Sequence, residues 1–331
     1  MKDFLCYYVV KPDRGPASAK VARRPIEELP AGDVLSQVAY SSLNYKDALS
    51  ATGHPGVTRK FPHVPGIDAA GKVVESGASE WKAGDEVLVT GYDMGQNTWG
   101  GYAEYVRVPA AWVVRRPEGL SLRECMILGT AGFTAGMGLD ALVERGVSPA
   151  RGEIVVTGAS GGVGSLAVAL LAKAGYQVVA STGKTSAHEL LKRLGAARVV
   201  GRDEVLDASD KPLLPSRWAG AIDTVGGKTL ATLVRSAHHD GCITCCGLVG
   251  GTDLPLSVYP FILRGVELAG IDSAECPRER RLRVWRKLAG EWKPNDLEQL
   301  ATESNLNQLG PHIQEILAGR NTGRVLVTPT T

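Results

Sequence analysis

The sequence predicts an α/β fold in which a β-rich domain is joined to a doubly wound parallel sheet. Three observations support this: the length of 331 residues, the short apolar runs separated by Gly and Pro in residues 1–125, and the alternating strand and helix patterns that follow. This length suits two domains of roughly 150 residues each. Because 44% of the residues are hydrophobic, both domains can form a core without disulfides or metals.

The composition excludes several classes of protein. Lys and Arg number 37 and Asp and Glu number 35, so the net charge is +2 and a nucleic acid is not expected as a partner. The chain has no uninterrupted run of about 18 apolar residues, so no membrane span is expected. The 40 glycines show no period, which excludes a collagen-like chain.

The first residues are predicted to form a strand rather than a secretion signal. The apolar stretch Phe4–Val10 is short, follows Asp3 and ends at Lys11, whereas a signal peptide has a longer apolar region and a small-residue cleavage site. The six cysteines are therefore expected to be free thiols, and the protein is expected in the cytoplasm.

The β-rich domain is predicted to consist of two separate pieces of chain, residues 1–125 and 296–331. Gly and Pro divide the first piece into short runs with the spacing of a small barrel. Its strands are expected at residues 34–40, 71–75, 85–90 and 102–108. Segment 323–328 reads as a further strand. It follows a sheet that is already complete, so we expect it to return to this domain.

The second domain is predicted to span residues 126–295. Apolar residues have helical spacing over Met126–Glu144, and an Arg-rich helix is expected at Pro277–Leu288. Further helices are expected at Val163–Ala174 and Ala187–Leu194. The expected strands are Glu153–Gly158, Gln177–Ser181, Arg198–Val200, Gly220–Thr224, Cys242–Cys246 and Val266–Ile271. Six parallel strands form a complete doubly wound sheet.

A glycine-rich turn follows the first of these strands and opens a helix. Gly158, Gly161 and Gly164 have the spacing G-x-x-G-x-x-G, a variant of the dinucleotide-binding fingerprint. The glycines let a pyrophosphate approach the backbone N–H groups, and the helix N-terminus adds a partial positive charge. Strand, turn, helix and next strand follow one another within about 30 residues, so we predict a dinucleotide site rather than a purely structural turn.

The end of the next strand indicates which dinucleotide is bound. An NAD site usually has Asp or Glu there, bonded to the ribose 2′-hydroxyl. This chain has Ser181-Thr182-Gly183-Lys184 instead, and hydroxyls with a lysine suit a 2′-phosphate. Arg198 is expected to add a charge-assisted contact. The predicted cofactor is therefore NADPH, and the alternative interpretation of Lys184 is a solvated lysine at a helix start.

Several segments resemble the medium-chain dehydrogenase/reductase superfamily over essentially the whole chain. They are most similar to its zinc-free acrylyl-CoA reductase branch, whose members are also described as quinone oxidoreductases of the YhdH/YhfP type. The matching segments are Ser41–Asp47, Pro65–Val73, Gly84–Val87, Gly100–Glu104, Gly129–Ala135, Gly158–Ser165, Pro260–Arg264 and Gly270–Ser273.

The resemblance implies a GroES-like substrate domain and a Rossmann domain, with nicotinamide and substrate bound between them. It implies that Tyr45 lines the nicotinamide pocket and that Asn321 closes it. The other cofactor-binding residues implied are Ser160, Gly161, Gly162 and Val163 for the pyrophosphate, Thr182, Gly183, Lys184 and Arg198 for the 2′-phosphate, and Leu248, Ile262 and Ser273 for the nicotinamide ribose and carboxamide.

No metal site is predicted. Zinc alcohol dehydrogenases of this superfamily have a Cys near the position of Asn44, and they have Gly-His-Glu where this chain has Gly66-Ile67-Asp68. Residues 80–115 contain none of the four cysteines of a structural zinc lobe. Cys242 and Cys245 supply at most two of four ligands and lie in a predicted strand, so they are interpreted as core cysteines.

The zinc-free members reduce activated C=C bonds, and the resemblance implies the same reaction here. Hydride leaves nicotinamide C4 for the β-carbon, negative charge develops on the carbonyl oxygen, and a proton must reach the α-carbon. Tyr45 and Asp68 are the candidate catalytic residues, although Asp68 is alternatively a buried structural carboxylate. Distant enoyl thioester reductases have a Tyr where this chain has His54-Pro55, so the proton donor stays open, with solvent as one alternative.

The predicted reaction is the NADPH-dependent reduction of a short 2-enoyl-CoA thioester, most simply acrylyl-CoA to propanoyl-CoA. The alternatives are a quinone or enone reductase without a CoA preference, and a non-catalytic NADPH-binding protein. The phosphates of CoA need cations, and the candidates are Arg264, Arg278, Arg280, Arg281, Arg283 and the end of the loop Gly53–Lys60. The helical arginines are alternatively a solvated face or part of the interface of a homodimer, which is the expected assembly.

Overall fold

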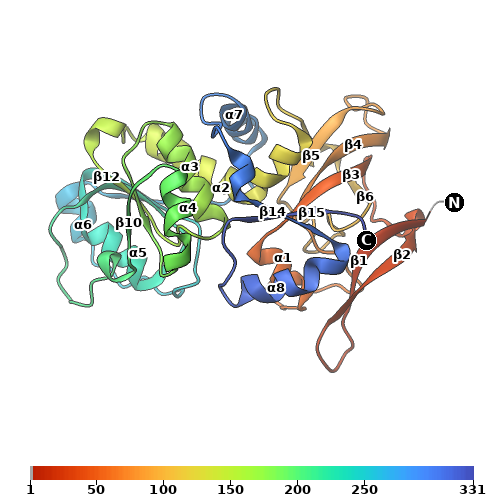
Figure 1. Ribbon diagram of the computed structural model, residues 1–331, viewed down its shortest axis with the longest axis horizontal. Coiled ribbons are helices and arrows are strands. Elements are labelled where there is room, and N and C mark those ends of the chain that lie inside the picture. Colours follow the sequence, from red (N-terminus) through yellow and green to blue (C-terminus); the bar gives the residue numbers. More distant parts are fainter. Residues whose placement is uncertain (1–2) are drawn as a thin grey trace. The chain divides into compact units, whose positions relative to one another are not determined.

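The computed structural model describes residues 3–331, which form two compact units (Figure 1). The first contains the chain up to Thr130 together with Asp296–Thr331, and the second contains Ala131–Asn295. The first boundary falls inside helix α2 (Leu122–Glu144), one residue after Gly129. Gly129 has a φ of 50° and a ψ of −156°, which break the helix. This positive φ disfavours other side chains, so glycine permits the break.

The first unit is built on a seven-stranded sheet and a two-stranded hairpin. The sheet has the order β14-β15-β3-β4-β5-β7, with β6 paired to β3, and the hairpin consists of β1 and β2. The strands are β1 (Asp3–Val10), β2 (Ser18–Pro25), β3 (Val34–Leu43), β4 (Asp68–Ser76), β5 (Glu86–Thr90), β6 (Tyr105–Val108), β7 (Val114–Arg115), β14 (Ala301–Asn305) and β15 (Arg324–Thr328). The helices are α1 (Tyr45–Ala51) and α8 (Leu309–Leu317). Because β15 pairs antiparallel with β3, the end of the chain completes a sheet that begins near its start.

Two hydrophobic cores hold this unit together. One joins the hairpin to α1 and α8 and contains Phe4, Tyr102 and Leu309. The other packs β3, β4 and β5 together and contains Val34 and Trp81. Since α1 packs into the first core, the backbone position of its first residue is fixed.

The second unit is a doubly wound sheet of six parallel strands, which confirms the predicted fold class. Its order is β10-β9-β8-β11-β12-β13. The strands are β8 (Ile154–Val156), β9 (Val178–Ser181), β10 (Ala196–Val200), β11 (Trp218–Asp223), β12 (Ala237–Cys245) and β13 (Glu267–Gly270). The helices are α3 (Gly162–Lys173), α4 (His188–Arg193), α5 (Gly227–Arg235), α6 (Tyr259–Arg264) and α7 (Arg278–Ala289). The strand order reverses between β8 and β11, and ligands of such sheets bind beyond the carboxyl ends of the strands at this point.

Several strands are longer than the sequence pattern indicates, and β12 extends furthest. β12 begins at Ala237 rather than at the predicted Cys242, because Ala237 also pairs with Trp218 of β11. The intervening polar residues of β12 are exposed or half-buried, so they lack the apolar pattern by which a strand is detected.

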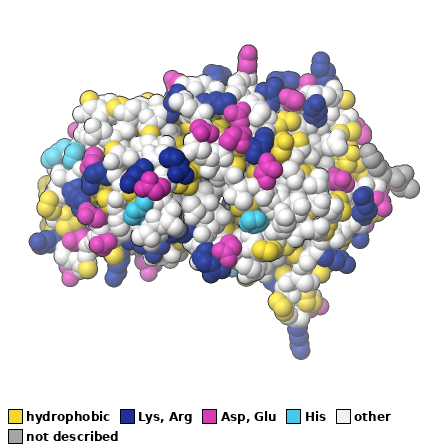
Figure 2. Space-filling view, viewed as in Figure 1, with side chains coloured by type: hydrophobic (Ala, Val, Ile, Leu, Met, Phe, Trp, Pro, Cys, Tyr) yellow, Lys and Arg dark blue, Asp and Glu magenta, His cyan; other side chains and the backbone are white. Residues whose placement is uncertain are grey.

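Helix α2 has the length and apolar composition of a membrane span, although the sequence contains no uninterrupted apolar run of that length. Of its most apolar window, 89% is buried inside the protein, as is usual for a core helix. On the face seen in Figure 2, basic and acidic side chains are interspersed, in agreement with the small net charge.

Candidate functional site

The glycine-rich turn leads from β8 into α3. Gly158 has a φ of 57°, and a Cβ atom there would clash with the hydroxyl of Thr224. A Cβ atom on Gly164 would clash with the backbone of Gly158, so α3 packs tightly against the turn. Gly161 is the N-cap of this 12-residue helix and supplies no side-chain cap. The turn thus offers the close backbone approach and the helix N-terminus that a pyrophosphate requires. The predicted pyrophosphate-binding residues Ser160, Gly161, Gly162 and Val163 all lie in it.

Asp223, at the carboxyl end of β11, holds this turn in place. The Thr157 hydroxyl donates to Asp223 Oδ1 at 2.6 Å, and Gly226 N donates to Asp223 Oδ2 at 2.7 Å. Burial raises the pKa of Asp223, while the bond from Thr157 lowers it. Sequence reasoning did not identify this residue, whose only signal is its place at the end of a predicted strand.

The carboxyl ends of β9 and β10 carry the residues expected to contact a 2′-phosphate. The Thr182 and Ser160 hydroxyls lie 2.9 Å apart, which ties this segment to the glycine turn. The Thr182 hydroxyl also accepts a bond from Lys184 N at 3.1 Å. A Cβ atom on Gly183 would lie 2.7 Å from Arg202 Nε, so the Arg202 side chain packs over Gly183.

Lys184 and Arg202 place two like charges close together. Burial and the charge of Arg202 lower the pKa of the Lys184 ammonium below its ordinary value. Two neighbouring cations repel each other, and a bound phosphate would replace this repulsion by attraction to both. The pair is therefore suited to an anion. Sequence reasoning did not identify Arg202, although it follows β10 much as Lys184 follows β9.

Arg198, predicted to contact the same phosphate, is engaged elsewhere. Its Nε and Nη2 atoms each donate to one carboxylate oxygen of Glu153, both at 2.9 Å. Glu153 precedes β8, so this ion pair lies toward the amino ends of the strands, whereas the glycine turn follows their carboxyl ends. β10 continues for two residues beyond Arg198, and the side chain reaches back from that point. Arg202, rather than Arg198, lies beside Gly183 and Lys184.

Ser273 follows β13, and its position is fixed from two sides. Its hydroxyl accepts a bond from the Thr134 hydroxyl at 2.7 Å. Arg281 Nη2 donates to the carbonyls of Ser273, at 3.1 Å, and Ala274, at 2.9 Å. The Arg281 guanidinium lies over the ring of Phe133, 4.9 Å from its centroid. Arg281 is wholly buried and supports this loop, so it is not available as a surface cation for CoA.

Three further predicted cofactor residues lie in different places. Leu248, 62% exposed, follows β12 and approaches Gly226 after β11, at the carboxyl ends. Ile262, 68% exposed, lies on α6, whose last residue Arg264 donates to three carbonyls near the amino ends of β11 and β12. The structure therefore does not bring Ile262 to the glycine turn. Asn321 precedes β15 in the first unit, and its side-chain amide donates to the carbonyl of Gly323.

In the first unit, Tyr45 begins α1, and 42% of its surface is exposed. The preceding Asn44 caps the helix together with Asp47, whose Oδ2 accepts bonds from Asn44 N at 2.9 Å and Asn44 Nδ2 at 3.1 Å. Asp47 Oδ1 accepts a bond from Ile67 N at 2.8 Å. Burial and the charge of Asp68 raise the pKa of Asp47 to about 7. The backbone at Tyr45 is thus held firmly while its ring stays accessible.

Asp68 is wholly buried at the start of β4 and bonds only within the protein. Its Oδ2 accepts bonds from the Ser42 hydroxyl at 2.6 Å and from Asn44 Nδ2 at 2.7 Å. Its Oδ1 accepts bonds from the Thr130 hydroxyl at 2.6 Å and from Thr130 N at 2.9 Å. A carboxylate saturated in this way leaves little room for a substrate, so the geometry favours the structural interpretation of Asp68 over the catalytic one.

A buried arginine of β15 completes this cluster. Arg324 is 2% exposed, and its Nη2 lies 3.9 Å from Asp68 Oδ2. Its other partners are Ser42 Oγ at 2.8 Å, Ile127 O at 3.0 Å, and Leu43 O and Asn44 Oδ1 at 3.2 Å each. Sequence reasoning did not identify Arg324, because no local pattern reports a partner 282 positions away.

The donor atoms of this cluster do not fit a zinc ion. Among residues 3–331, no three His, Cys, Asp or Glu side chains lie close enough together to hold a metal. Where zinc dehydrogenases have ligands, this chain has Asn44, whose amide N–H faces Asp68, and a carboxylate already saturated by hydrogen bonds. Cys242 is buried, and burial raises its pKa to about 11, so it is a thiol rather than a thiolate ligand.

The arginines of α7 are largely paired within the second unit. Arg280 and Arg283 approach the buried Asp140 at 3.5 Å and 2.6 Å. Arg264 and Arg281 bond to backbone carbonyls. Because these four guanidinium groups pair with an acid or with carbonyls, they are not free cations for CoA phosphates, whereas Arg278 of α7 is exposed.

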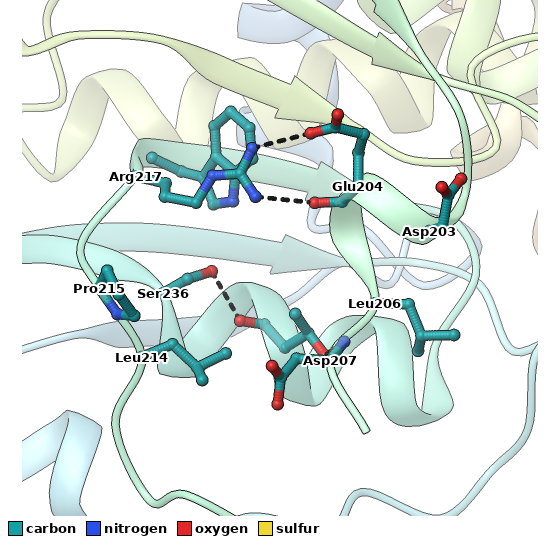
Figure 3. Close-up of a pocket in the computed structure, with 10 residues that line it drawn as sticks. Asp203, Glu204, Leu206, Asp207, Leu214, Pro215, Arg217 and Ser236 are labelled. Carbon is teal, nitrogen blue, oxygen red and sulfur yellow. Dashed lines mark hydrogen bonds and ion pairs between the residues drawn. The ribbon is translucent and has the colours of Figure 1, made fainter. Parts of the chain in front are cut away.

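A pocket of about 370 Å³ lies elsewhere in the second unit (Figure 3). Figure 3 shows Arg217 bonded to Glu204, and Ser236 bonded to a carbonyl of α5. Ser236 and Arg217 precede β12 and β11, so this part of the pocket lies near the amino ends of the strands, away from the glycine turn. Arg217 and Ser236 are therefore engaged within the second unit.

Two protein families match the sequence. Residues 30–118 match the alcohol dehydrogenase GroES-like domain, and residues 162–289 match the zinc-binding dehydrogenase family. The first match lies within the first unit and the second within the second unit.

Several relatives cover nearly the whole chain. "Probable acrylyl-CoA reductase AcuI" of Escherichia coli K12 is 50% identical over 313 residues, which are 95% of this chain and 96% of that protein. "Putative quinone oxidoreductase YhfP" of Bacillus subtilis 168 is 46% identical over 302 residues, which are 91% of this chain and 92% of that protein.

Solved structures of similar proteins have the same fold. YhdH of E. coli K-12 with bound NADPH gives a TM-score of 0.94 at 49% identity, over 98% of this chain and all of that one. YhfP of B. subtilis with NAD bound gives a TM-score of 0.97 at 43% identity, over 99% of this chain and all of that one.

Proposed function

The chain belongs to the medium-chain dehydrogenase/reductase family, and we propose that it uses NADPH to reduce the C=C bond of a short 2-enoyl-CoA thioester, converting acrylyl-CoA to propanoyl-CoA. The observation that supports this proposal most is the pair Lys184 and Arg202 beside the glycine turn of the second unit. In the balanced reaction, the enoyl thioester, NADPH and one proton give the saturated thioester and NADP⁺.

In the second unit, different residues bind different parts of the cofactor. When bound, NADPH supplies the hydride that is added to the β-carbon of the substrate. The turn at Ser160–Val163 binds the pyrophosphate, and Lys184 and Arg202 bind the 2′-phosphate. Leu248 and Ser273, at the same carboxyl edge of the sheet, line the nicotinamide end. The role of Ile262 and Asn321 in cofactor binding rests on the family resemblance alone.

Tyr45 is the side chain that we propose for positioning the substrate in the first unit. Its ring is accessible, and its backbone is fixed by the cap of α1. A phenol next to the substrate can donate a hydrogen bond to the carbonyl oxygen, on which negative charge develops. Asp68 is bonded on both oxygens, so we propose that the proton reaches the α-carbon from solvent and that Asp68 supports the site without direct contact.

The choice of CoA thioester is supported by the names of the relatives and by two exposed cations. Because most of the α7 arginines are paired, we propose that Arg59 and Lys60, both exposed in the first unit, contact the CoA phosphates. A remote handle supplies binding energy that orients the reacting carbon, so its removal lowers kcat/KM.

The first experiment is a screen of NADPH oxidation with acrylyl-CoA, crotonyl-CoA and simple quinones. We expect the highest kcat/KM with acrylyl-CoA. Higher kcat/KM with quinones would establish the alternative of a quinone or enone reductase. NADPH binding without turnover of any acceptor would establish the non-catalytic alternative.

A second experiment tests the CoA handle. Acrylyl-pantetheine should have a kcat/KM at least tenfold below that of acrylyl-CoA, or about 1.4 kcal/mol. The double variant Arg59→Gln/Lys60→Gln should lose this preference, and the control Lys20→Gln/Arg23→Gln, which changes two exposed cations of the hairpin, should keep it. Equal reaction of both thioesters with the wild type would contradict CoA recognition.

We also propose that the protein is a homodimer in the cytoplasm. Helix α6 and its N-cap residue expose an apolar face made of Val258, Ile262 and Leu263. It lies next to β13, the edge strand of the sheet, whose free side can pair with a second copy. The double variant Val258→Asp/Leu263→Asp should be monomeric in light scattering, whereas the wild type should have twice the chain mass. The six free cysteines suit a reducing compartment, which cell fractionation would check.

A further inference from the structure

The family implies a zinc ion, but the first unit has a different cation at the place where its ligands would stand. We propose that the buried guanidinium of Arg324 is the resident cation beside Asn44 and Asp68, and that Arg324 is a positioning residue for Tyr45. This inference rests on the proposed role of Tyr45 and deepens it.

The bonds of Arg324 connect three distant segments of the first unit. It comes from β15, and it donates to the end of β3 through Ser42 and Leu43. It also donates to Ile127 O, two residues before the break in α2. A Cβ atom on Gly129 would lie 3.0 Å from Arg324 Nη2 and 2.5 Å from Asp68 Oδ2, so the break is shaped around the ion pair.

The guanidinium determines the orientation of the Asn44 amide. Asn44 Oδ1 accepts the bond from Arg324 Nη1 at 3.2 Å, which leaves Asn44 Nδ2 to donate to Asp68 at 2.7 Å and to Asp47 at 3.1 Å. With the amide turned over, its NH₂ group would face the guanidinium and its oxygen would face two carboxylates. Asn44 is the residue before Tyr45, so a fixed Asn44 fixes the start of α1.

The charges of the cluster explain why a cation is needed there. Asp68 is wholly buried, and a buried carboxylate is stable only when it is paired and hydrogen-bonded. Burial lowers the pKa of Arg324, while the charge of Asp68 raises it, so the carboxylate stabilises the charged guanidinium. A zinc ion would meet a saturated carboxylate, an amide N–H and a guanidinium, none of which is a suitable ligand.

Metal analysis tests the first half of the proposal without any activity assay. Protein produced with added zinc and then dialysed should contain well under one zinc per chain, and a chelator should change neither its thermal midpoint nor its turnover. One zinc per chain that resists dialysis would overturn the assignment of Arg324 as the resident cation.

The second half is tested by removing both charges together, so that neither Asp68 nor Arg324 is left buried without the other. The double variant Arg324→Met/Asp68→Asn should keep a thermal midpoint close to that of the wild type. Its kcat with the preferred acceptor should fall at least tenfold, while its KM for NADPH should change less than threefold, because the phosphate-binding residues lie in the second unit. A folded double variant with wild-type kcat would show that Arg324 only stabilises the fold.

The control is Arg320→Met, the same substitution at an exposed arginine that pairs with Glu315 five positions earlier in the chain. It should leave both kcat and KM unchanged. If the double variant does not fold, the single variant Arg324→Lys tests the proposal instead. Lysine keeps the charge but cannot reach all the acceptors of Arg324, so we expect kcat to fall at least threefold, and wild-type kcat would overturn the proposal.

Hydrogen–deuterium exchange separates a failure of this inference from a failure of the proposed function. Amides of α1 should exchange at least tenfold faster in the double variant or in Arg324→Lys, and at the wild-type rate in Arg320→Met. Unchanged exchange would overturn the positioning role even if the wild type reduces acrylyl-CoA. A wild type without turnover of any acceptor would defeat the proposed function but would leave the exchange result interpretable.

Discussion

The two units of this protein differ in how their charged side chains are arranged. In the second unit, Lys184 and Arg202 have the same sign and are held together beside the glycine turn. In the first unit, Asp68 and Arg324 have opposite signs, are buried, and are surrounded by hydrogen bonds. A surface that must bind an ion keeps an excess of charge, whereas a structural cluster balances its charges internally. The substitutions below test this contrast.

The largest effect is expected at the balanced cluster. Asp68→Ala leaves the Arg324 guanidinium buried without its carboxylate, and breaking a buried ion pair in this way costs about 3–5 kcal/mol. Urea denaturation followed by tryptophan fluorescence should show that this variant unfolds at a lower urea concentration than the wild type. The control Glu315→Ala breaks an exposed ion pair and should have no measurable effect. An unchanged transition for Asp68→Ala would show that the cluster is not balanced by this pair.

A smaller effect, on binding rather than stability, is expected at the pair of like charges. Lys184→Ala and Arg202→Ala should each remove a charge-assisted bond to the 2′-phosphate, about 1.5–3 kcal/mol. The KM for NADPH should rise more than tenfold in each variant, and the KM for NADH should stay nearly constant. Equal increases in the KM for NADPH and the KM for NADH would mean that these cations do not contact the 2′-phosphate.

The lowered pKa of Lys184 predicts a pH dependence of cofactor binding. NADPH needs the protonated ammonium, so its affinity should be full below the lowered pKa of the free protein and should fall as pH rises through it. Fluorescence titrations at increasing alkaline pH should show this decline for NADPH and not for NADH. In Arg202→Ala the neighbouring charge is gone, so the decline should move to higher pH. A decline at the same pH in that variant would contradict the coupling.

The smallest effect is expected for Arg198, the cation that the sequence pattern favours. Its guanidinium is bonded to Glu153 toward the amino ends of the strands, so Arg198→Ala should change the KM for NADPH by less than about twofold. A rise above tenfold, equal to that in Arg202→Ala, would mean that Arg198 changes partner when the cofactor binds.

Most of the second unit follows from local patterns in the sequence. The six strands and the turn at Gly158 are recognisable because each strand is a short apolar run, and the glycine spacing reports a backbone conformation directly. The amino end of β12 is the exception, because its residues are polar and its pairing with Trp218 depends on a neighbouring strand. The sequence predicts the position of the backbone that forms the candidate site better than it predicts the positions of the long side chains around it.

The sequence by itself therefore determined the fold class, the dinucleotide turn and the absence of suitable zinc ligands at Asn44 and Asp68, because each depends on residues close together in the chain. Only the tertiary structure separates Arg198, which bonds to Glu153 toward the amino ends of the strands, from Arg202, which packs over Gly183 at their carboxyl ends, because a long side chain can reach either edge of the sheet. Only it brought Arg324 to Asp68, more than 250 residues apart, because burial and charge compensation act in space rather than along the chain.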